Sequence, residues 1–420
     1  MQALTLSRRP RPQEVLPSPM SNAPSASCSD STDPIRVGVL FSRSGPTARI
    51  ETSMLLGTLF AIREINDAGG LLGRELVAVH HDPQASPQRY ASLAGRLIHE
   101  DGVNVLFGGY MSNGRKAMLP VVERANRVLF YPAMYEGFEF SPNVIYTGGT
   151  PNQHCAPLAQ FMIERYGPRV YLVGSDYIFP YECNRLMSDF VLRAPGGRKL
   201  GERYVSLEAQ EKDFVPIARD IRDRAPDFVF STVVGRSTRM LYQACADAGL
   251  DPARTPIASV TTLEPEVTEM GSRTAAGHYT ASTYFRSIDS ARNRDCLGRF
   301  ARLFGDRVEP NMCWESAYFQ VHLFAAAFRA AGSDDAARLL PHVLGSSFDA
   351  PQGRVRVDPA THHTRLHPRI ARVDRNGAFE ILAESVDGVD PDPYLTGDDS
   401  GDWSRRLRPV GSALHEEAGP

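Results

Sequence analysis

The sequence predicts an α/β protein with two Rossmann-like lobes, whose parallel central sheets are joined by a three-strand hinge. Three observations support this fold class. Strand and helix patterns alternate at the spacing of βαβ units from residue 35 onward. The same alternation restarts after Gly149, which indicates a second lobe. Towards the C-terminal end the pattern changes to the period-2 alternation of β-hairpins, so the chain must cross between the lobes more than once.

In the first lobe, short apolar runs bounded by turn residues predict buried parallel strands, and amphipathic stretches predict the helices between them. The strands are expected at residues 35–41, 75–81 and 103–107, and the helices at 49–67 and 87–100. Residues 107–149 then predict, in order, strand, polar loop, helix, strand, aromatic loop and strand. We expect this stretch to supply one wall of a binding site.

The second lobe repeats this organisation without a close sequence repeat. Strands are expected at 170–173, 203–206, 228–232 and 256–260, and helices at 152–166, 182–192, 214–224 and 238–249. Helices at 290–304, 313–331 and 334–345 follow, and hairpin structure begins near residue 348. Crossings between lobes are expected near residues 146–150, 279–284 and 348–353. A hinge of three strands that closes on a ligand is a two-state element.

These patterns predict four parts of the chain. Residues 1–34 form a disordered N-terminal extension, and residues 387–420 form an irregular C-terminal tail. Lobe I comprises residues 35–147 plus 282–347, and lobe II comprises 148–281 plus 348–386. The extension is rich in proline and serine and contains no apolar segment typical of a secretory signal, so we expect a cytoplasmic protein.

Composition excludes several classes of function. The 420 residues are 42% hydrophobic and 23% charged, as in soluble globular proteins. The net charge of −3 gives no basic field for nucleic acid, and no apolar run is long enough to span a membrane. Six cysteines lack the spacing of a metal site, so buried free thiols and no cofactor are expected: Cys28, Cys155, Cys183, Cys245, Cys296 and Cys313.

Enzyme signatures are missing as well. The sequence contains no phosphate-binding P-loop, no nucleophile elbow and no dinucleotide-binding glycine pattern after the first strand. Ser112 has no identifiable base partner, so we expect no catalysis. His362, His363 and His367 could suggest a metal site, but neighbouring strand residues point to opposite faces. We expect surface histidines on a hairpin instead.

Two loops in residues 107–149 carry the candidate binding residues. The first loop offers Tyr110, Ser112 and Asn113, and the second offers Tyr131, Met134 and Tyr135. Each loop follows the carboxyl end of a strand, where open α/β sheets bind small molecules. None of the six is charged, which favours a small, neutral, hydrogen-bonding ligand. From the other lobe we expect Tyr177 and Phe179 at one strand end and Val234 at another.

Two structural readings of these residues remain open. Ser112 precedes a helix expected to begin near Arg115, so its hydroxyl could simply cap that helix instead of meeting a ligand carbonyl. Tyr110 and Tyr131 could be ordinary aromatic residues at the rim of a sheet. A cluster of buried phenols needs hydrogen-bond partners, however, and this favours a polar ligand.

Several ordered motifs resemble a known family. GGYMSNGRKAMLPVVERA, FYPAMYEGFEFSPNVIYTGG, PNQ, VGSDYIFP and FSTVVGRST resemble the aliphatic amidase expression-regulating proteins, and APQGRVRV and PDPY extend the match to roughly residues 35–404. The resemblance implies a type I periplasmic-binding-protein fold closing on a short aliphatic amide. It also implies a cytoplasmic amide sensor, a negative regulator of an amidase operon. Such a sensor sequesters an RNA-binding transcription antitermination regulator until amide arrives, and we expect a homo-oligomer.

The resemblance also implies a ligand shell. Carried over position by position, it comprises Tyr110, Ser112, Tyr131, Ala133, Met134, Tyr177, Phe179 and Val234. Ala133, Met134 and Phe179 depart from the Thr, Pro and Tyr of the amidase-regulator pattern, so the identity of the amide stays open.

Related urea or short-chain amide ABC transporter substrate-binding proteins share the RKA, YEG, SPN, PNQ and GSDY elements. Phe179 is similar to the residue that these transporter proteins carry at its position. Tyr110, by contrast, stands at a position that looks like Trp in the urea-binding proteins. A transporter substrate-binding protein is therefore the alternative function.

Overall fold

The computed structural model describes residues 33–305, 308–396 and 407–410. The prediction of a disordered extension therefore falls outside the described residues except at its last two positions. Within residues 387–396 there is no helix or strand, but the tail is not wholly irregular, because β16 (Arg408–Pro409) pairs with β15 (Phe379–Glu384).

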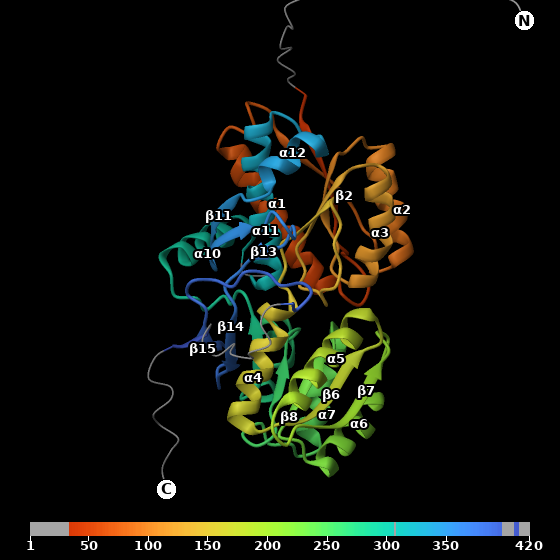
Figure 1. The fold of residues 1–420 in the computed structure, drawn as a ribbon, viewed down its shortest axis with the longest axis vertical. Helices are drawn as coiled ribbons and strands as arrows, with labels where there is room; N and C mark the ends of the chain where they lie inside the picture. The colour runs from red at the N-terminus through yellow and green to blue at the C-terminus, as the bar shows by residue number, and fades with distance from the viewer. Residues whose placement is uncertain (1–32, 306–307, 397–406, 411–420) are drawn as a thin grey trace, which may run out of the picture. The chain divides into compact units, whose positions relative to one another are not determined.

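A five-stranded parallel sheet forms the centre of what we call lobe I. In sheet order the strands are β2 (Leu76–His81), β1 (Ile35–Leu40), β3 (Val105–Gly108), β4 (Val128–Tyr131) and β5 (Val144–Tyr146). Helices α2 (Pro87–His99) and α3 (Ser112–Arg124) pack side by side beyond one face (Figure 1). On the other face α1 (Ala48–Asp67) packs against α11 (Met312–Ala331).

An eight-stranded sheet forms the centre of what we call lobe II. Its parallel part is β7 (Arg198–Val205), β6 (Arg169–Ser175), β8 (Phe228–Thr232), β9 (Ile257–Ser259) and β10 (Tyr279–Ser282), extended antiparallel by β14 (Arg369–Val373), β15 and β16. Its helices are η1 (Pro151–Gln153), α4 (Cys155–Tyr166), α5 (Ile178–Arg193), α6 (Glu211–Arg224), α7 (Arg236–Asp247), α8 (Glu264–Met270) and α9 (Ser272–Ala275). Helices α5, α6 and α7 lie beside strands β6, β7 and β8 (Figure 1).

The rest of the chain follows the predicted change to antiparallel structure. After α10 (Ala291–Phe304), α11 and α12 (Ala336–Val343), a third sheet contains β11 (Ser347–Ala350), β12 (Gly353–Val357) and β13 (Thr364–Arg365). The predicted parallel sheets in two lobes are confirmed, although β7 and α5 begin earlier than the sequence pattern indicates. The exact lobe boundaries stay a prediction.

Local sequence explains why these elements form. The six residues of β1 (IRVGVL) are almost all buried, as expected for a central parallel strand covered on both faces. Helix α2 begins where Ser86 accepts the backbone N–H of Arg89, and Pro87 occupies its first turn. At α11 the Asn311 side chain accepts two backbone N–H groups. The core is thus built from locally specified elements.

Buried hydrogen bonds tie the crossings together. Arg369 of β14 donates to the carbonyl oxygens of Thr283 and Gln352, both at 2.8 Å. The Gln352 side chain in turn donates to Glu315 of α11 at 2.6 Å. Arg369 therefore links two crossings, and Glu315 links one of them to lobe I.

Candidate functional site

The first candidate loop lies where β3 ends. Register pairs Phe107 of β3 with Phe130 of β4, so the loop after β3 and the end of β4 lie at the same edge of the sheet. Gly109 has a φ of +87°, which turns the chain away from the strand at a position suited to glycine. Tyr110 follows and is buried. The loop and strand end predicted to meet therefore do so.

Ser112 is placed differently from the prediction. It is the first residue of α3, the helix is capped at Met111, and no side chain makes the cap hydrogen bond. The Ser112 hydroxyl donates to Glu136 and accepts from Arg115. The hydroxyl is therefore engaged within the protein. The Gly114 N–H is engaged as well, because it donates to the Met111 carbonyl and to the Asn113 side chain. A ligand carbonyl could use the backbone N–H groups of Ser112 and Asn113 at the start of the helix.

A buried charge cluster lies behind this loop. The Arg115 side chain is fully buried and donates to Glu136 at 2.9 Å and to Glu139 at 2.8 Å. Its guanidinium lies 4.8 Å from the ring centre of Tyr131 and 4.6 Å from that of Tyr135. Burial pushes the pKa of Glu139 upward, but Arg115 outweighs burial and holds the pKa below its usual value. This cluster therefore connects the two candidate loops through buried ion pairs.

Tyr131 and Tyr110 are joined directly. The Tyr131 hydroxyl donates to the backbone carbonyl of Tyr110 at 2.6 Å. Burial raises the pKa of Tyr131, against the effect of Arg115, so the phenol stays neutral. Like Ser112, Tyr131 thus contributes its hydroxyl to the architecture of the site.

Tyr110 and Tyr177 have free hydroxyls on opposite lobes. Tyr177 precedes α5 in lobe II, and its ring stacks on Phe179 with centroids 6.3 Å apart. Burial raises the pKa of Tyr110 well above its usual value, and the charges that Cys313 and Tyr177 would carry raise it further. Among the described residues neither hydroxyl has a hydrogen-bond partner. Each lobe therefore contributes one neutral phenol whose hydrogen-bonding capacity is unused.

The remaining predicted residues form apolar surroundings. Ala133, Met134, Phe179 and Val234 are all buried. The backbone of Ala133 packs closely against Gly148 in the first crossing. The approach is so close that a Cβ at position 148 would lie 2.0 Å from the Ala133 carbonyl oxygen. The Val234 backbone N–H donates to Ser175 at 3.1 Å. These residues can limit the size of a ligand but offer it no polar side-chain group.

The prediction of surface histidines at 362, 363 and 367 is wrong, because all three residues are buried. His363 is fully buried, and its ring stacks on Tyr146 with centroids 4.2 Å apart. It also hydrogen-bonds the Tyr135 hydroxyl, and the backbone of His362 accepts Tyr146 N–H. The pattern of a hairpin could not show that this segment docks on the first crossing. No group of residues able to hold a metal ion occurs in the part of the chain that the structure describes.

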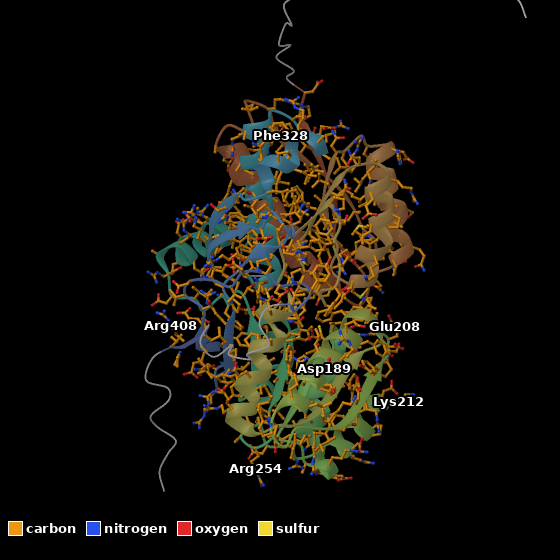
Figure 2. All side chains as sticks on the ribbon, viewed as in Figure 1. Asp189, Glu208, Lys212, Arg254, Phe328 and Arg408 are labelled. Atoms are coloured by element: carbon orange, nitrogen blue, oxygen red, sulfur yellow. The ribbon has the colours of Figure 1, made fainter. Side chains whose placement is uncertain are left out.

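A cavity of about 480 Å³ lies between the lobes. Its lining residues are Gly45, Pro46, Thr47, Ala48, Arg49, Ile50, Glu208, Gly235, Arg236, Glu266 and Glu269. Of these, Glu208 is labelled in Figure 2. Arg49 bridges to Glu269 at 3.6 Å, and a Cβ on Gly235 would lie 2.5 Å from the Pro46 carbonyl oxygen. The two lobes therefore meet around this cavity.

Glu266 gives the cavity wall a pH-sensitive carboxyl. Only 6% of the residue is exposed, and burial raises its pKa to about 7, while burial raises that of Glu264 to about 8. The folded protein holds these two protons more tightly than the unfolded chain, in which the carboxyls have their ordinary pKa of 4.5. The contribution of the two groups to the free energy of unfolding is therefore fully present below pH 4.5. It is lost as the pH rises through about 7 for Glu266 and about 8 for Glu264.

We expect the Glu266→Gln variant to lose the part of the pH dependence of stability that Glu266 causes. The variant should unfold like the natural protein at pH 5 and be more stable at pH 8, by up to about 3 kcal/mol for a pKa change of this size. Calorimetric melting between pH 5 and 8 measures it. Glu208→Gln, an exposed carboxyl at the same cavity, is the control. Parallel melting curves for the natural protein and Glu266→Gln would contradict the assignment.

Sequence reasoning missed the charged residues of the site. Arg115, Glu136 and Glu266 are buried, although each lies in a segment predicted to carry neutral ligand contacts or an ordinary loop. One signal was available: Arg115 and Glu136 lie within the RKA and YEG motifs, in the stretch of otherwise neutral candidate residues. Nothing local distinguishes Glu266 from a helix-capping glutamate, and it does accept the Leu263 N–H in that way.

Comparison with known proteins agrees with this architecture. The sequence profile described as "Periplasmic binding protein domain" matches residues 35–399. The Leu/Ile/Val-binding protein homolog 6 of Brucella melitensis biotype 1 is 27% identical over 339 residues, covering 79% of this chain and 85% of that protein. A leucine-, isoleucine-, valine-, threonine- and alanine-binding protein of Pseudomonas aeruginosa is 23% identical, covering 81% and 90%.

Solved structures show the same fold. A solute-binding protein of an ABC transporter from Rhodopseudomonas palustris BisB5, in complex with 3,4-dihydroxybenzoic acid, has a TM-score of 0.77 and 22% identity, covering 85% of this chain and 98% of that one. LivJ from Streptococcus pneumoniae, in complex with isoleucine, has a TM-score of 0.73 and 19% identity, covering 85% of this chain and 100% of that one.

In the described residues no helix is long and apolar enough to cross a membrane.

Proposed function

This chain belongs to the periplasmic binding protein domain family, and from that membership we propose that it is a solute-binding protein for a short aliphatic amide or urea. One observation carries the choice of ligand. The hydroxyls of Tyr110 and Tyr177 come from opposite lobes, and neither has a partner among the described residues. Phenols can donate to a carbonyl oxygen and accept from an NH₂ group, so an amide satisfies both.

The charges around the cleft favour a neutral ligand over a carboxylate. Arg115, behind the first candidate loop, is paired with Glu136, and the two arginines that line the 480 Å³ cavity are also paired, Arg49 with Glu269 and Arg236 with Glu208. A buried carboxylate ligand without a free cation would pay a large desolvation cost. The relatives' ligands named above, isoleucine and a benzoic acid, both carry such a group.

In the proposed complex, backbone N–H groups at the start of α3 bind the ligand oxygen. Tyr110 and Tyr177 bind the remaining polar atoms, and Tyr131 holds the first loop in place. Met134, Phe179 and Val234 limit the alkyl group. Ala133 and Phe179 carry no hydroxyl, so the choice among acetamide, longer amides and urea depends on shape.

Titration calorimetry of the whole chain tests this proposal. We expect saturable binding of acetamide, propionamide, butyramide or urea, and no heat of binding with leucine or 4-hydroxybenzoate. The proposal is contradicted if leucine or 4-hydroxybenzoate binds and none of the four neutral compounds does.

The amide sensor implied by the motif resemblance is a second candidate for the same site. The relatives' names describe binding proteins and transporter components, and they favour the transport role. A sensor would be cytoplasmic and would release an RNA-binding antitermination regulator on binding amide, through a difference in affinity between open and closed forms. Fractionation of cells that produce the native chain separates the two roles.

A further inference from the structure

The 480 Å³ cavity between the lobes has a lining distinct from the candidate loops. Lobe I contributes the loop after β1 and the first turn of α1, and lobe II contributes residues near the starts of α7 and α8. None of the residues in the predicted ligand shell, all of which the structure describes, is among its lining residues. Protein cavities of about 300–1,000 Å³ bind small organic molecules, so this cavity has room for a ligand of its own.

The charged side chains that line the cavity do not balance. Arg49 bridges to Glu269 at 3.6 Å, and Arg236 bridges to Glu208 at 2.8 Å. Glu266 is the remaining charged lining residue, and it has no ion pair within the ranges of the chain that the structure describes. The lining therefore contains one carboxylate more than it has guanidinium groups, and each guanidinium group already has a carboxylate partner.

Glu266 has one carboxyl oxygen to spare. Only 6% of the residue is exposed, and its Oε2 accepts the Leu263 N–H at 3.0 Å. Its Oε1 has no hydrogen-bond partner among the described residues. A buried carboxylate without a cation is costly, and when ionised its oxygens can only accept hydrogen bonds. The ligand that suits this wall therefore carries both a positive charge and N–H donors.

We propose that the cavity is a binding site for a protonated primary amine, with Glu266 as its counter-ion. An ammonium group brings one positive charge and three N–H donors, so it can donate to Oε1 and balance the excess carboxylate. A carboxylate on the same ligand is disfavoured, because both arginines of the lining are engaged. A neutral oxygen can instead accept from the N–H groups of Arg49 and Ile50 at the start of α1, which have no partner among the described residues. The fitting class is a small amine or amino alcohol without a carboxylate.

Binding of an ammonium group should release a proton from Glu266. Burial raises the pKa of this carboxyl to about 7, so about half of the molecules carry the proton at pH 7. A cation bound beside the carboxyl favours the ionised form. The other charged groups that line the cavity are Arg49, Arg236, Glu208 and Glu269, and all four are held in ion pairs. Glu266 is therefore the expected source of the proton.

Titration calorimetry of the natural full-length chain tests this site. Propylammonium and ethanolamine are the probes, tetramethylammonium is the cation without N–H donors, and 1-propanol is the uncharged control. We expect saturable binding of propylammonium, ethanolamine or both at pH 7, and no heat of binding with either control. Repeating the propylammonium titration in buffers of different ionisation enthalpy counts the protons released. We expect about half a proton per ligand at pH 7 and almost none near pH 9.

Two variants assign the binding to Glu266. Glu266→Gln keeps an oxygen for the Leu263 N–H but removes the charge, so amine binding should weaken by at least about tenfold and the proton release should vanish. Glu208→Gln changes an exposed carboxyl of the same lining and should leave the affinity within about twofold. Circular dichroism establishes that both variants are folded.

Three results would overturn the proposal. The first is that neither probe binds the natural protein. The second is that tetramethylammonium binds as tightly as propylammonium, since the site would then lack the acceptor that N–H donors need. The third is that folded Glu266→Gln binds the amines as the natural protein does. Proton release is measured on the natural protein and so tests the role of Glu266 even if that variant does not fold.

Discussion

Replacing Arg115 with methionine is expected to lower the free energy of unfolding by about 3–5 kcal/mol, because it leaves a buried carboxylate without its partner. Arg115 is fully buried, and the Glu136 side chain is 4% exposed, so water cannot replace the lost ion pair. The variant also loses the contacts of the guanidinium with the Tyr131 and Tyr135 rings. Scanning calorimetry measures the loss without a urea-like denaturant that could itself bind.

Two further variants show whether the loss of stability in Arg115→Met comes from the unpaired buried carboxylate or from the substitution in general. Lys116→Met removes an ion pair with Glu139 at 2.9 Å, but the lysine side chain is 44% exposed, so we expect a loss of less than about 1 kcal/mol. Arg115→Met combined with Glu136→Gln should recover part of the stability, because the unpaired charge is gone. Equal melting temperatures for Arg115→Met and Lys116→Met would contradict this account of the cluster.

The second large effect is expected on ligand affinity. Tyr110→Phe and Tyr177→Phe should each weaken amide binding about 10–100-fold, the effect of losing one or more buried hydrogen bonds to the ligand. Neither change should lower the melting temperature of the ligand-free protein, because neither hydroxyl has a partner among the described residues. Calorimetric titration with the best-binding amide or urea gives the dissociation constants.

Two other tyrosines calibrate this result. Tyr131→Phe should cost about 1–3 kcal/mol of stability as well as affinity, because it leaves the buried Tyr110 carbonyl oxygen without its donor. Tyr171→Phe removes a hydroxyl that donates to Asp220, within lobe II, and should leave ligand affinity unchanged. If Tyr110→Phe and Tyr177→Phe bind as the natural protein does, the proposed pocket is in the wrong place.

The fold could be predicted from the sequence because its signals are local. The buried run at β1 and the proline-capped start of α2 each specify their element within a few residues. The order of such elements along the chain then leaves few possible topologies. The early start of α5 at Ile178 was not visible, because its first turn lacks an acidic residue or a side-chain cap.

The meeting of the two candidate loops could be predicted from the sequence, but the use of their hydroxyls could not. Ser112 and Tyr131 were expected to offer theirs to a ligand, yet Glu136 accepts from one and the Tyr110 carbonyl from the other. These partners depend on contacts between loops, which residue spacing does not report. The burial of His363 follows from the same cause, since its neighbours come from a crossing more than 200 positions earlier.

The central claim is that the cleft selects a neutral amide and excludes an anion of the same shape. Titration calorimetry of the natural protein with acetamide and with acetate tests it most directly, because the two ligands differ by little except charge and the NH₂ donors. We predict that acetamide binds at least 100-fold more tightly than acetate at pH 7. Equal affinity, or tighter binding of acetate, would contradict the account.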